Sequence, residues 1–278
     1  MKNPHLFHFG SAPFGAEYAW RPSWGGWERC YIRIFGLLDF PNRLRARLVK
    51  AEVDRLNPLK VLDLGSGTGC YSFYLSREGR GVSGVDMDEE RICESAHIAE
   101  RLGRRNLRFY CGSAGECLQD FPSESFEIAL AMEVLQYLGD VGLALREIYR
   151  VLKPGGHLVG HVPALGYLRP QERTLFDDQE IQSMLSSRNF RIIKIVPTFG
   201  RTLRALCGIY DVISRWRVLA GLLFPFILWA SMPLPLENPG GNYRFFVARK
   251  PDEATNEGPE TRDGGPGETD EEWKEKKK

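Results

Sequence analysis

The sequence predicts an α/β fold in which a doubly wound, mainly parallel sheet carries helices on both faces. Between residues 59 and 162, short apolar runs alternate with segments of helical periodicity. Strands that alternate with helices are joined by right-handed crossovers, which lay the strands parallel in one sheet. The apolar runs are "LKVLDL", "GVSGVD", "NLRFYCG", "FEIALAM" and "HLVGHVP".

Further segments flank this alternation on both sides. Residues 190–199 and 242–250 are later strand candidates, and residues 42–56 are predicted to form a helix that packs Leu44, Leu48 and Leu56 on the sheet. The chain is therefore divided into an N-terminal helical and aromatic cap (1–57), a main domain (58–250) with a helical insertion (200–240), and a disordered tail (251–278).

Composition and charge argue against several classes of protein. The net charge of +1 combines −5 in residues 251–278, where ten acids face five bases, with +6 in residues 1–250. This excess is too small to indicate nucleic-acid binding, and the polar tail has too little apolar surface to offset the entropy of ordering. Six cysteines without a C-x-x-C pair indicate neither disulfides nor a metal site. Because no secretory signal begins the sequence, we expect a cytoplasmic protein.

The most specific motif is "VLDLGSGTG", residues 61–69. Asp63 lies near the end of an apolar strand, and a loop with Gly65, Gly67 and Gly69 follows, which lets the backbone approach a ligand closely. Cys70 stands where a dinucleotide fingerprint needs a small residue. This loop, together with the segments that follow it to residue 163, resembles the class I S-adenosylmethionine-dependent methyltransferases.

The resemblance implies a Rossmann-like seven-stranded sheet, mostly parallel with an antiparallel last strand, and S-adenosylmethionine as cofactor. Amides after Gly69 would complement the carboxylate of the cofactor, and Asp63 would accept from its ammonium, directly or through water. Asp86, twenty-one residues after Gly65, ends the second strand, where a ribose diol needs an acceptor. The implied cofactor-binding positions are Asp63, Gly65, Ser66, Gly67, Gly69, Asp86, Met87, Ser113, Ala114 and Glu133.

Several of these assignments have a structural alternative. Asp63 and Asp86 also suit the caps of strand ends, and Met87 suits packing as well as a soft contact with adenine. Ser113 replaces the acid that is usual at its place, so it suits either a helix cap or an adenine contact, with the Ala114 amide beside it as a second donor.

The candidate for a catalytic base is His161, at the end of the fifth predicted strand. Methyl transfer is an in-line displacement in which positioning supplies much of the rate, and an oxygen acceptor would also want a base. The alternative for His161 is a strand-end histidine satisfied by backbone groups. Tyr137 and Tyr167 are interpreted as walls of the substrate site. The fourth strand lacks the Asn-Pro-Pro-Tyr loop of amide and adenine nitrogen methylation, which favours a small molecule or a lipid.

The stretch "VLAGLLFPFILWASMPLPL", residues 218–236, has no charge and is interrupted by Pro225, Pro233 and Pro235. A single membrane crossing is not expected, because it would place the two flanking strands on opposite sides of a bilayer. The preceding residues, 200–217, form an amphipathic pattern with four arginines. The insertion is therefore interpreted as a lid over the acceptor pocket or a foot in the membrane interface, with packing on the sheet or on a second subunit as the alternative.

Together these features predict an S-adenosylmethionine-dependent methyltransferase that acts on an oxygen or carbon atom of an apolar small molecule or lipid. The alternatives are a binding protein that keeps the fold without turnover, and another transferase on the same cofactor, such as an aminopropyltransferase. We expect no nucleic-acid partner and no metal. Peripheral membrane contact through residues 200–240 is an open alternative, and the oligomeric state stays open.

Overall fold

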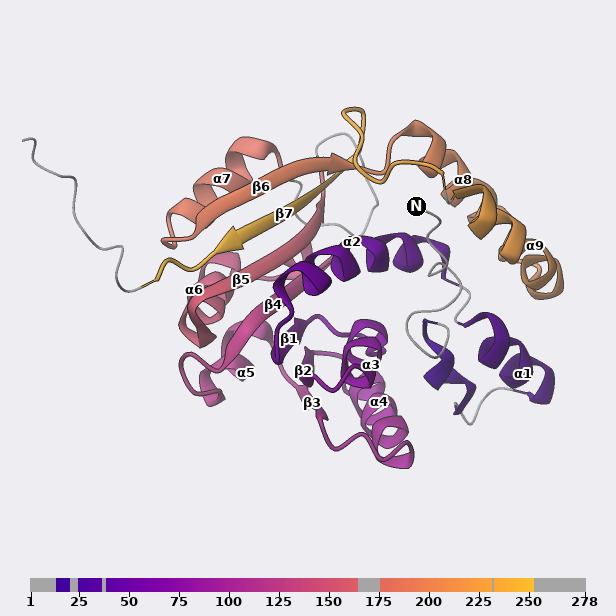
Figure 1. The fold of residues 1–278 in the computed structure, drawn as a ribbon, viewed down its shortest axis with the longest axis horizontal. Coiled ribbons are helices and arrows are strands. Elements are labelled where there is room, and N and C mark those ends of the chain that lie inside the picture. Colours follow the sequence, from indigo (N-terminus) through magenta and orange to yellow (C-terminus); the bar gives the residue numbers. More distant parts are fainter. Residues whose placement is uncertain (1–13, 21–24, 37–38, 165–175, 232, 253–278) are drawn as a thin grey trace, which may run out of the picture.

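A seven-stranded sheet organises the fold, and its strands lie in the order β3-β2-β1-β4-β5-β7-β6 (Figure 1). The structure, a computed structural model, describes residues 14–20, 25–36, 39–164, 176–231 and 233–252. The predicted Tyr167 wall and nearly all of the predicted tail lie outside these residues. The strands are β1 (Lys60–Leu64), β2 (Gly81–Asp86), β3 (Leu107–Cys111), β4 (Phe126–Met132), β5 (Leu152–Pro163), β6 (Arg191–Thr198) and β7 (Tyr243–Arg249).

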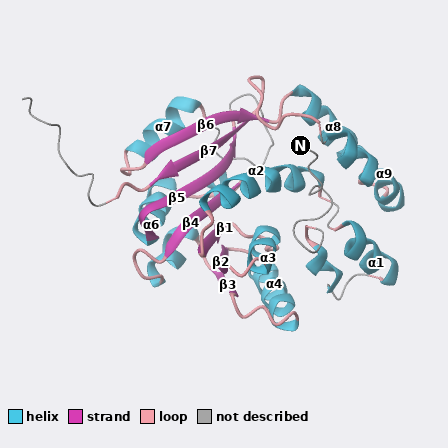
Figure 2. Cartoon of the chain, in the orientation of Figure 1, coloured by secondary structure: helices cyan, strands magenta, loops and turns pink. Residues whose placement is uncertain are grey.

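The direction of the strands confirms the predicted fold class (Figure 2). Strands β3, β2, β1, β4 and β5 pair in parallel. The last strand, β7, runs antiparallel to β5 and to β6, between which it lies. The two late strand candidates therefore complete the sheet, as expected of a Rossmann-like arrangement with an antiparallel final strand.

Helices cover both faces of the sheet because successive strand residues point to opposite sides. Val61 belongs to a core with helices α2 to α4, whereas its neighbour Leu62 belongs to a core with α5 to α7. The sheet and the helices on its two faces thus form three layers, as in a doubly wound fold. The helices are α2 (Phe40–Leu56), α3 (Cys70–Arg77), α4 (Glu89–Arg101), α5 (Ala114–Cys117), α6 (Val141–Val151) and α7 (Asp178–Ser186).

Helix α2 joins the N-terminal segment to the sheet and to the insertion. It begins after Asp39, whose carboxylate accepts from the Asn42 amide at 3.1 Å. Leu48 packs in the core beside the sheet, and Leu56 packs partly against it, as predicted. Leu44 instead belongs to a third core that α2 shares with the insertion. The described part of the cap also holds a short 3-10 helix, η2 (Ala16–Trp20), and α1 (Gly26–Phe35).

The insertion consists of two helices, α8 (Arg201–Ile213) and α9 (Arg217–Ser231). The expectation that Pro225 interrupts the apolar stretch is wrong, because α9 continues through it. A proline leaves the carbonyl four residues earlier without its helical donor. Here that carbonyl belongs to Gly221, and it accepts from the Tyr31 hydroxyl of α1 at 2.5 Å. A contact from a distant helix thus offsets the lost bond.

No helix within the described part of the chain combines the length and the apolar character that a membrane crossing requires. Helix α9 has 15 residues, and one of its faces packs in the third core. Phe224 and Leu228 of this face are fully buried, together with Phe40 and Leu44 of α2.

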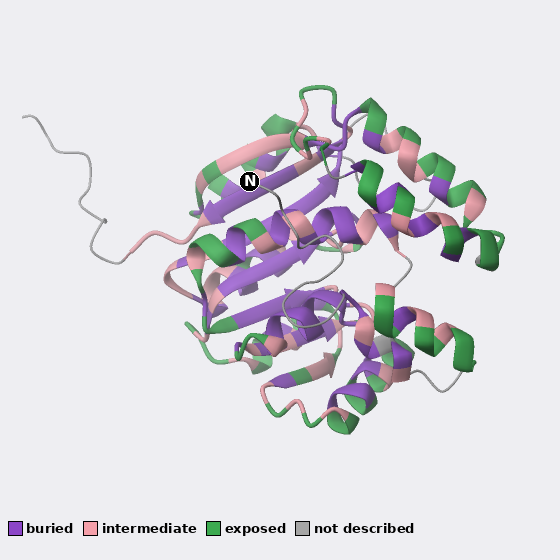
Figure 3. Ribbon diagram, turned by 45° about the vertical axis from the view of Figure 1, so that its right-hand side comes forward, coloured by how far each residue is buried: buried purple, intermediate pink, exposed green. Residues whose placement is uncertain are grey.

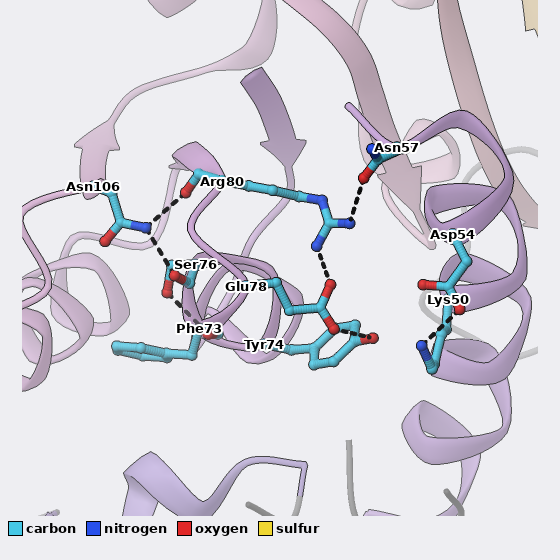
Figure 4. A network of polar contacts seen from close by, with 9 residues as sticks. All are labelled: Lys50, Asp54, Asn57, Phe73, Tyr74, Ser76, Glu78, Arg80 and Asn106. Carbon is cyan, nitrogen blue, oxygen red and sulfur yellow. Dashed lines mark hydrogen bonds and ion pairs between the residues drawn. The ribbon is translucent and has the colours of Figure 1, made fainter. Parts of the chain in front are cut away.

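A polar network holds the end of the sheet at which β2 and β3 begin (Figure 4). Asn106, just before β3, donates to the Ser76 carbonyl and to the Arg80 carbonyl, both at 2.7 Å. The Arg80 guanidinium in turn contacts Glu78 and reaches Asn57, at the end of α2, at 3.4 Å. One amide side chain therefore satisfies two backbone carbonyls in the turn that joins α3 to β2.

We expect Asn106→Ala to lower the free energy of unfolding by about 1–3 kcal/mol, because the Arg80 carbonyl loses the Asn106 donor and the Ser76 carbonyl keeps only the Gly79 amide. Chemical denaturation followed by circular dichroism measures this change. The control is Gln182→Ala, which removes an exposed amide from α7 and should change the free energy by less than about 0.5 kcal/mol. Equal effects of the two substitutions would contradict a bridging role for Asn106.

Candidate functional site

A pocket of about 470 Å³ opens at the carboxyl ends of β1, β2 and β4. Strand β1 pairs with β2 on one side and with β4 on the other, so the chain changes its winding direction at this point. Open α/β sheets bind ligands at such a switch point, and the volume suits a ligand of nucleoside size. Of the predicted cofactor residues, the pocket lining includes Gly65, Gly67, Asp86, Met87, Ser113, Ala114 and Glu133.

The glycine loop forms the floor between β1 and α3. The amides of Gly65 and Ser66 donate to the Val85 carbonyl at 2.8 and 3.0 Å, which ties the loop to β2. At Gly65, with φ +67°, an added Cβ would lie 2.5 Å from the Val134 side chain. At Gly69, with φ +75°, it would lie 2.7 Å from the Phe109 ring. Both positions therefore require glycine, for the backbone angle and for space.

Ser66 and Gly69 lie in the loop without lining the pocket. Gly69 is the N-cap residue directly before α3, in a left-handed conformation. Ser66 is 7% exposed, and its hydroxyl has no hydrogen-bond partner among the residues that the structure describes. A buried hydroxyl without a partner is costly, and a ligand or an ordered water in the adjoining loop would offset that cost.

Asp86 is held at the pocket wall by backbone amides. Gly67 donates to one of its carboxylate oxygens at 2.7 Å, and Asp88 donates to the other at 3.0 Å. A carboxylate has about four acceptor positions, so this one keeps acceptor capacity for two further donors. Met87 beside it is 75% exposed and lines the same pocket. This wall suits a vicinal diol next to a flat apolar group.

Of the two alternatives for Ser113, the structure shows the helix cap. Its side chain accepts from the Glu116 amide at 3.4 Å and donates to the Glu116 carboxylate at 2.9 Å, so it caps α5. It also lines the pocket, together with Ala114. Ala114 is the first residue of α5, where helical amides have no partner within the helix.

Asp63 is 1% exposed and is not part of the pocket lining. Its carboxylate accepts from the Ser72 hydroxyl of α3 at 2.5 Å. Burial raises the pKa of Asp63 to about 7, and the Asp86 charge adds to this rise although Ser72 opposes it. The structure therefore places Asp63 between β1 and α3, behind the glycine loop rather than at the pocket surface.

Glu133 follows β4 and lines the pocket, with an unusual positive φ of 58°. Its carboxylate contacts His161 Nδ1 at 2.5 Å and Arg45 at 3.5 Å. Strained backbone at the end of a strand is common in functional sites. Burial lowers the pKa of Arg45, but the charges around it, Glu133 first, raise it further, so the net pKa is raised and the guanidinium stays charged.

His161 is fully buried and does not line the pocket. Its second ring nitrogen, Nε2, lies 2.9 Å from the Thr198 hydroxyl, and its ring stacks on Tyr243 at 4.9 Å. Burial lowers the pKa of His161 below its ordinary value of 6.5, although Glu133 opposes this. The imidazole is therefore neutral at pH 7, with both nitrogens engaged by side chains rather than by the backbone groups that the alternative expected.

Sequence reasoning missed several groups around the pocket. Arg45 comes from α2, eighty-eight positions before the Glu133 that it contacts. Gln136 is fully buried, and neither of its amide atoms has a partner in the described ranges. Arg91, one turn into α4, lines the pocket beside Asp88. Arg91 had a local signal, its spacing from Asp86, whereas the contact of Arg45 with Glu133 is distant in sequence.

Comparison with known proteins identifies the kind of domain that builds this pocket. Residues 57–190 match a family model described as "Methyltransferase domain". Ubiquinone biosynthesis O-methyltransferase of Bradyrhizobium sp. (strain ORS 278) is 38% identical over 128 residues, which are 46% of this chain and 49% of that protein. Arsenite methyltransferase of Aquipseudomonas alcaligenes is 38% identical over 111 residues, 37% of this chain and 32% of that protein. The chain thus spans about half the length of the first of these relatives and about a third of the length of the second.

Solved structures share the fold at low identity. A putative sarcosine dimethylglycine methyltransferase from Galdieria sulphuraria has a TM-score of 0.56 at 15% identity, covering 76% of this chain and 87% of its own. The [4+2]-cyclase SpnF has a TM-score of 0.56 at 22% identity, covering 74% and 81%. Because one of these two proteins is described as a cyclase, the fold alone does not fix the reaction.

The raised pKa of Asp63 predicts a specific pH dependence of stability. The folded protein holds this proton up to about pH 7, whereas the unfolded chain releases it near pH 4, so Asp63 costs stability as the pH rises between these values. Asp63→Asn keeps the acceptor for Ser72 and cannot ionise. We expect its free energy of unfolding, relative to wild type, to increase between pH 4 and pH 8 by up to roughly 4 kcal/mol.

Denaturant titrations at both pH values measure this difference. Asp54→Asn, at an exposed acid of α2, is the matched control and should show almost no change with pH. A pH-independent difference between Asp63→Asn and wild type would contradict the buried, protonated state.

Proposed function

We propose that this chain, whose residues 57–190 match a methyltransferase-domain model, is a class I S-adenosylmethionine-dependent methyltransferase that methylates an oxygen or carbon atom of an apolar small molecule or lipid. The observation that carries the proposal is the pocket at the switch point, where the glycine loop, Asp86 and Glu133 meet. When bound, S-adenosylmethionine supplies an electrophilic methyl group on a sulfonium centre. The chain has to bind this cofactor, orient an acceptor and exclude water.

The residues present fit that cofactor. Asp86 keeps acceptor capacity for the ribose hydroxyls, and Met87 offers an exposed thioether to the adenine. Ser113 and the Ala114 amide, at the start of α5, suit the adenine edge. The Glu133 carboxylate lies 3.5 Å from the Arg45 guanidinium and complements the positive methionine end. Gly65 and Gly67 leave room for close approach of the ligand.

Asp63 supports this arrangement from behind the loop. A buried carboxylate without a cation near it is costly, as its raised pKa shows. The ammonium group of the cofactor would favour the ionised form, directly or through a water, and thereby offset part of this cost. Asp63 also holds Ser72 in the first turn of α3, whose amides face the loop.

His161 supports catalysis as a positioning residue in this proposal. It is enclosed, and its two nitrogens contact Glu133 and Thr198, so it fixes the Glu133 carboxylate rather than meeting an acceptor. Methyl transfer from a sulfonium needs alignment more than proton removal when the acceptor is a phenolate or another activated group. The sequence interpretation of His161 as the base is therefore not part of the proposed mechanism.

An apolar acceptor suits the lining of this pocket, which includes Val134, Tyr137 and Leu138. Phe199 lies 5.2 Å from the His161 ring and 5.5 Å from Tyr243, directly before α8. These aromatic rings connect the Glu133 side of the pocket to the third core and the insertion. The names of the curated relatives, which include ubiquinone biosynthesis O-methyltransferases, support an aromatic oxygen as acceptor.

Cofactor binding gives the first test. We expect Asp86→Ala to weaken S-adenosylmethionine binding by about a hundredfold or more, because two charge-assisted hydrogen bonds are lost. Isothermal titration calorimetry measures the affinity. Asp54→Ala removes an exposed acid far from the pocket and should bind the cofactor as the wild type does. Equal binding by both variants would exclude Asp86 from the cofactor site.

Turnover gives the second test of the proposal. Incubation with methyl-labelled S-adenosylmethionine and a total small-molecule and lipid extract should place label in organic-soluble material. Label in protein or RNA would contradict the proposed substrate class. Cofactor binding without any labelled product in the full range of extracts would favour the binding protein without turnover.

The pH dependence of turnover tests the role of His161. Burial lowers the pKa of His161. We therefore expect the pH profile of kcat/KM to show no inflection near pH 6.5 in the wild type, and the profile of His161→Asn to have the same shape. We expect this variant to lower kcat/KM about ten- to a hundredfold at every pH between 6 and 9, through loss of Glu133 alignment. Rate measurements on wild type and variant decide the point. An inflection near pH 6.5 that disappears in the variant would assign His161 as the base.

A further inference from the structure

Helices α1, α8 and α9 carry most of the large apolar side chains that the described part of the chain exposes. Figure 3 colours many residues along these helices as exposed. We call this surface the apolar ridge, and its members are between 37% and 69% exposed. Elsewhere the large exposed apolar side chains of the described residues are Leu59, Met87, Tyr137 and Ile193. The ridge consists of Trp27, Ile34, Ile209, Val212, Trp216, Val218, Leu219, Leu222, Phe226 and Trp229.

Helix α9 is apolar on opposite sides. Its buried side contains Ala220, Phe224, Ile227 and Leu228, which pack in or beside the third core. Its exposed side contains Leu219, Leu222, Phe226 and Trp229, spaced by three and four residues. That spacing forms one continuous stripe along a helix. The fold uses the first side, so the second is apolar surface without a partner within the described residues.

Helices α1 and α8 present similar stripes. Ile209, Val212 and Trp216 follow the same spacing at the end of α8, opposite the buried Leu203 and Tyr210. Trp27 and Ile34 lie seven residues apart on α1, which again places them on one side of the helix.

Contacts between α1 and α9 join these stripes. The Tyr31 hydroxyl donates to the Gly221 carbonyl, which Pro225 leaves free. The Trp27 ring stacks on Tyr31 at 5.4 Å, and its edge lies 3.2 Å from the position of a Cβ on Gly221. The exposed tryptophan of the N-terminal helix therefore lies beside the exposed helix of the insertion.

The charge of the helices that carry the apolar ridge indicates which kind of partner surface the ridge binds. Residues 26–35 and 201–231 contain six arginines and two acids, and α9 has no acid. Arg201 and Arg215 are exposed at the two ends of the α8 segment. In a symmetric pair of chains this basic surface would face itself, whereas an anionic lipid headgroup complements it. Tryptophan is also the side chain that prefers the boundary between headgroups and acyl chains.

We propose that the apolar ridge docks the protein on an anionic membrane surface, with α8 and α9 in the interfacial plane. The apolar stripes enter the boundary of the acyl region and the arginines contact headgroup phosphates. Phe199, at the start of α8, contacts His161, so the docked helices adjoin the Glu133 side of the pocket. Docking goes beyond the proposed methyl transfer and does not depend on it.

Vesicle flotation of the full chain tests the proposal. We expect the protein to float with phosphatidylcholine vesicles that contain phosphatidylglycerol, and much less with phosphatidylcholine alone or at high salt. Combining Leu222→Asp with Phe226→Asp should weaken binding at least about tenfold, because both side chains leave the bilayer. Ile193→Asp, at an exposed position of β6, is the matched control and should float as the wild type does.

Two further measurements make the outcome decisive. Combining Arg201→Glu with Arg215→Glu keeps every apolar side chain and should remove the preference for phosphatidylglycerol. This second variant tests the proposal even if the aspartate variant misfolds. Calorimetry with S-adenosylmethionine should give wild-type affinity for all variants, so a failure of docking is separate from a failure of the cofactor site. Equal flotation of wild type and the aspartate variant overturns the proposal. A second outcome also overturns it: the wild type binds no vesicles but forms a dimer in light scattering, and the aspartate variant does not form this dimer.

Discussion

The close approach of the glycine loop to its neighbours is the constraint on which the site depends. Two amides of the loop bond the same carbonyl of β2, and the space beside Gly65 is filled by Val134, which follows β4. Any side chain at Gly65 would push β1 and the segment after β4 apart. Because Glu133 precedes Val134, this one contact fixes the distance between the glycine loop and the carboxylate across the pocket. Asp86 is tied to the same loop through the Gly67 amide.

Electrostatics in this pocket depends on which charges have partners. Glu133 contacts Arg45 and His161, and its carboxylate lies at a pocket that a cationic ligand can reach. Asp63 is bonded by Ser72, and burial raises its pKa to about 7. The two carboxylates therefore act differently although both follow apolar strands. One offers a fixed negative charge, and the other is a buried group whose ionisation a bound cation would favour.

The N-terminal segment and the insertion form one structural unit although about 160 residues separate α2 from α9. The third core joins them, with Phe40 and Leu44 packed against Phe224 and Leu228. Arg45, the neighbour of Leu44, extends from the same helix to Glu133. Packing of the insertion thus bears on the position of a charge that contacts the pocket residue Glu133. The proposed membrane contact would act at the same end of the molecule.

The local sequence pattern was enough to predict the strands, the glycine loop and the place of Asp86. The alternation of apolar runs with helical segments, the strand ends and the left-handed turns all depend on residues that are neighbours in sequence. Contacts distant in sequence decided the rest. His161 is enclosed because Thr198 and Tyr243 come from strands that the chain reaches later, and Leu44 leaves the sheet because the insertion covers it. Helix α9 passes through Pro225 because a tyrosine 190 positions from Gly221 supplies the missing donor. Periodicity marks α9 as apolar, but only packing decides which side is buried, since burial depends on neighbours that the pattern does not contain.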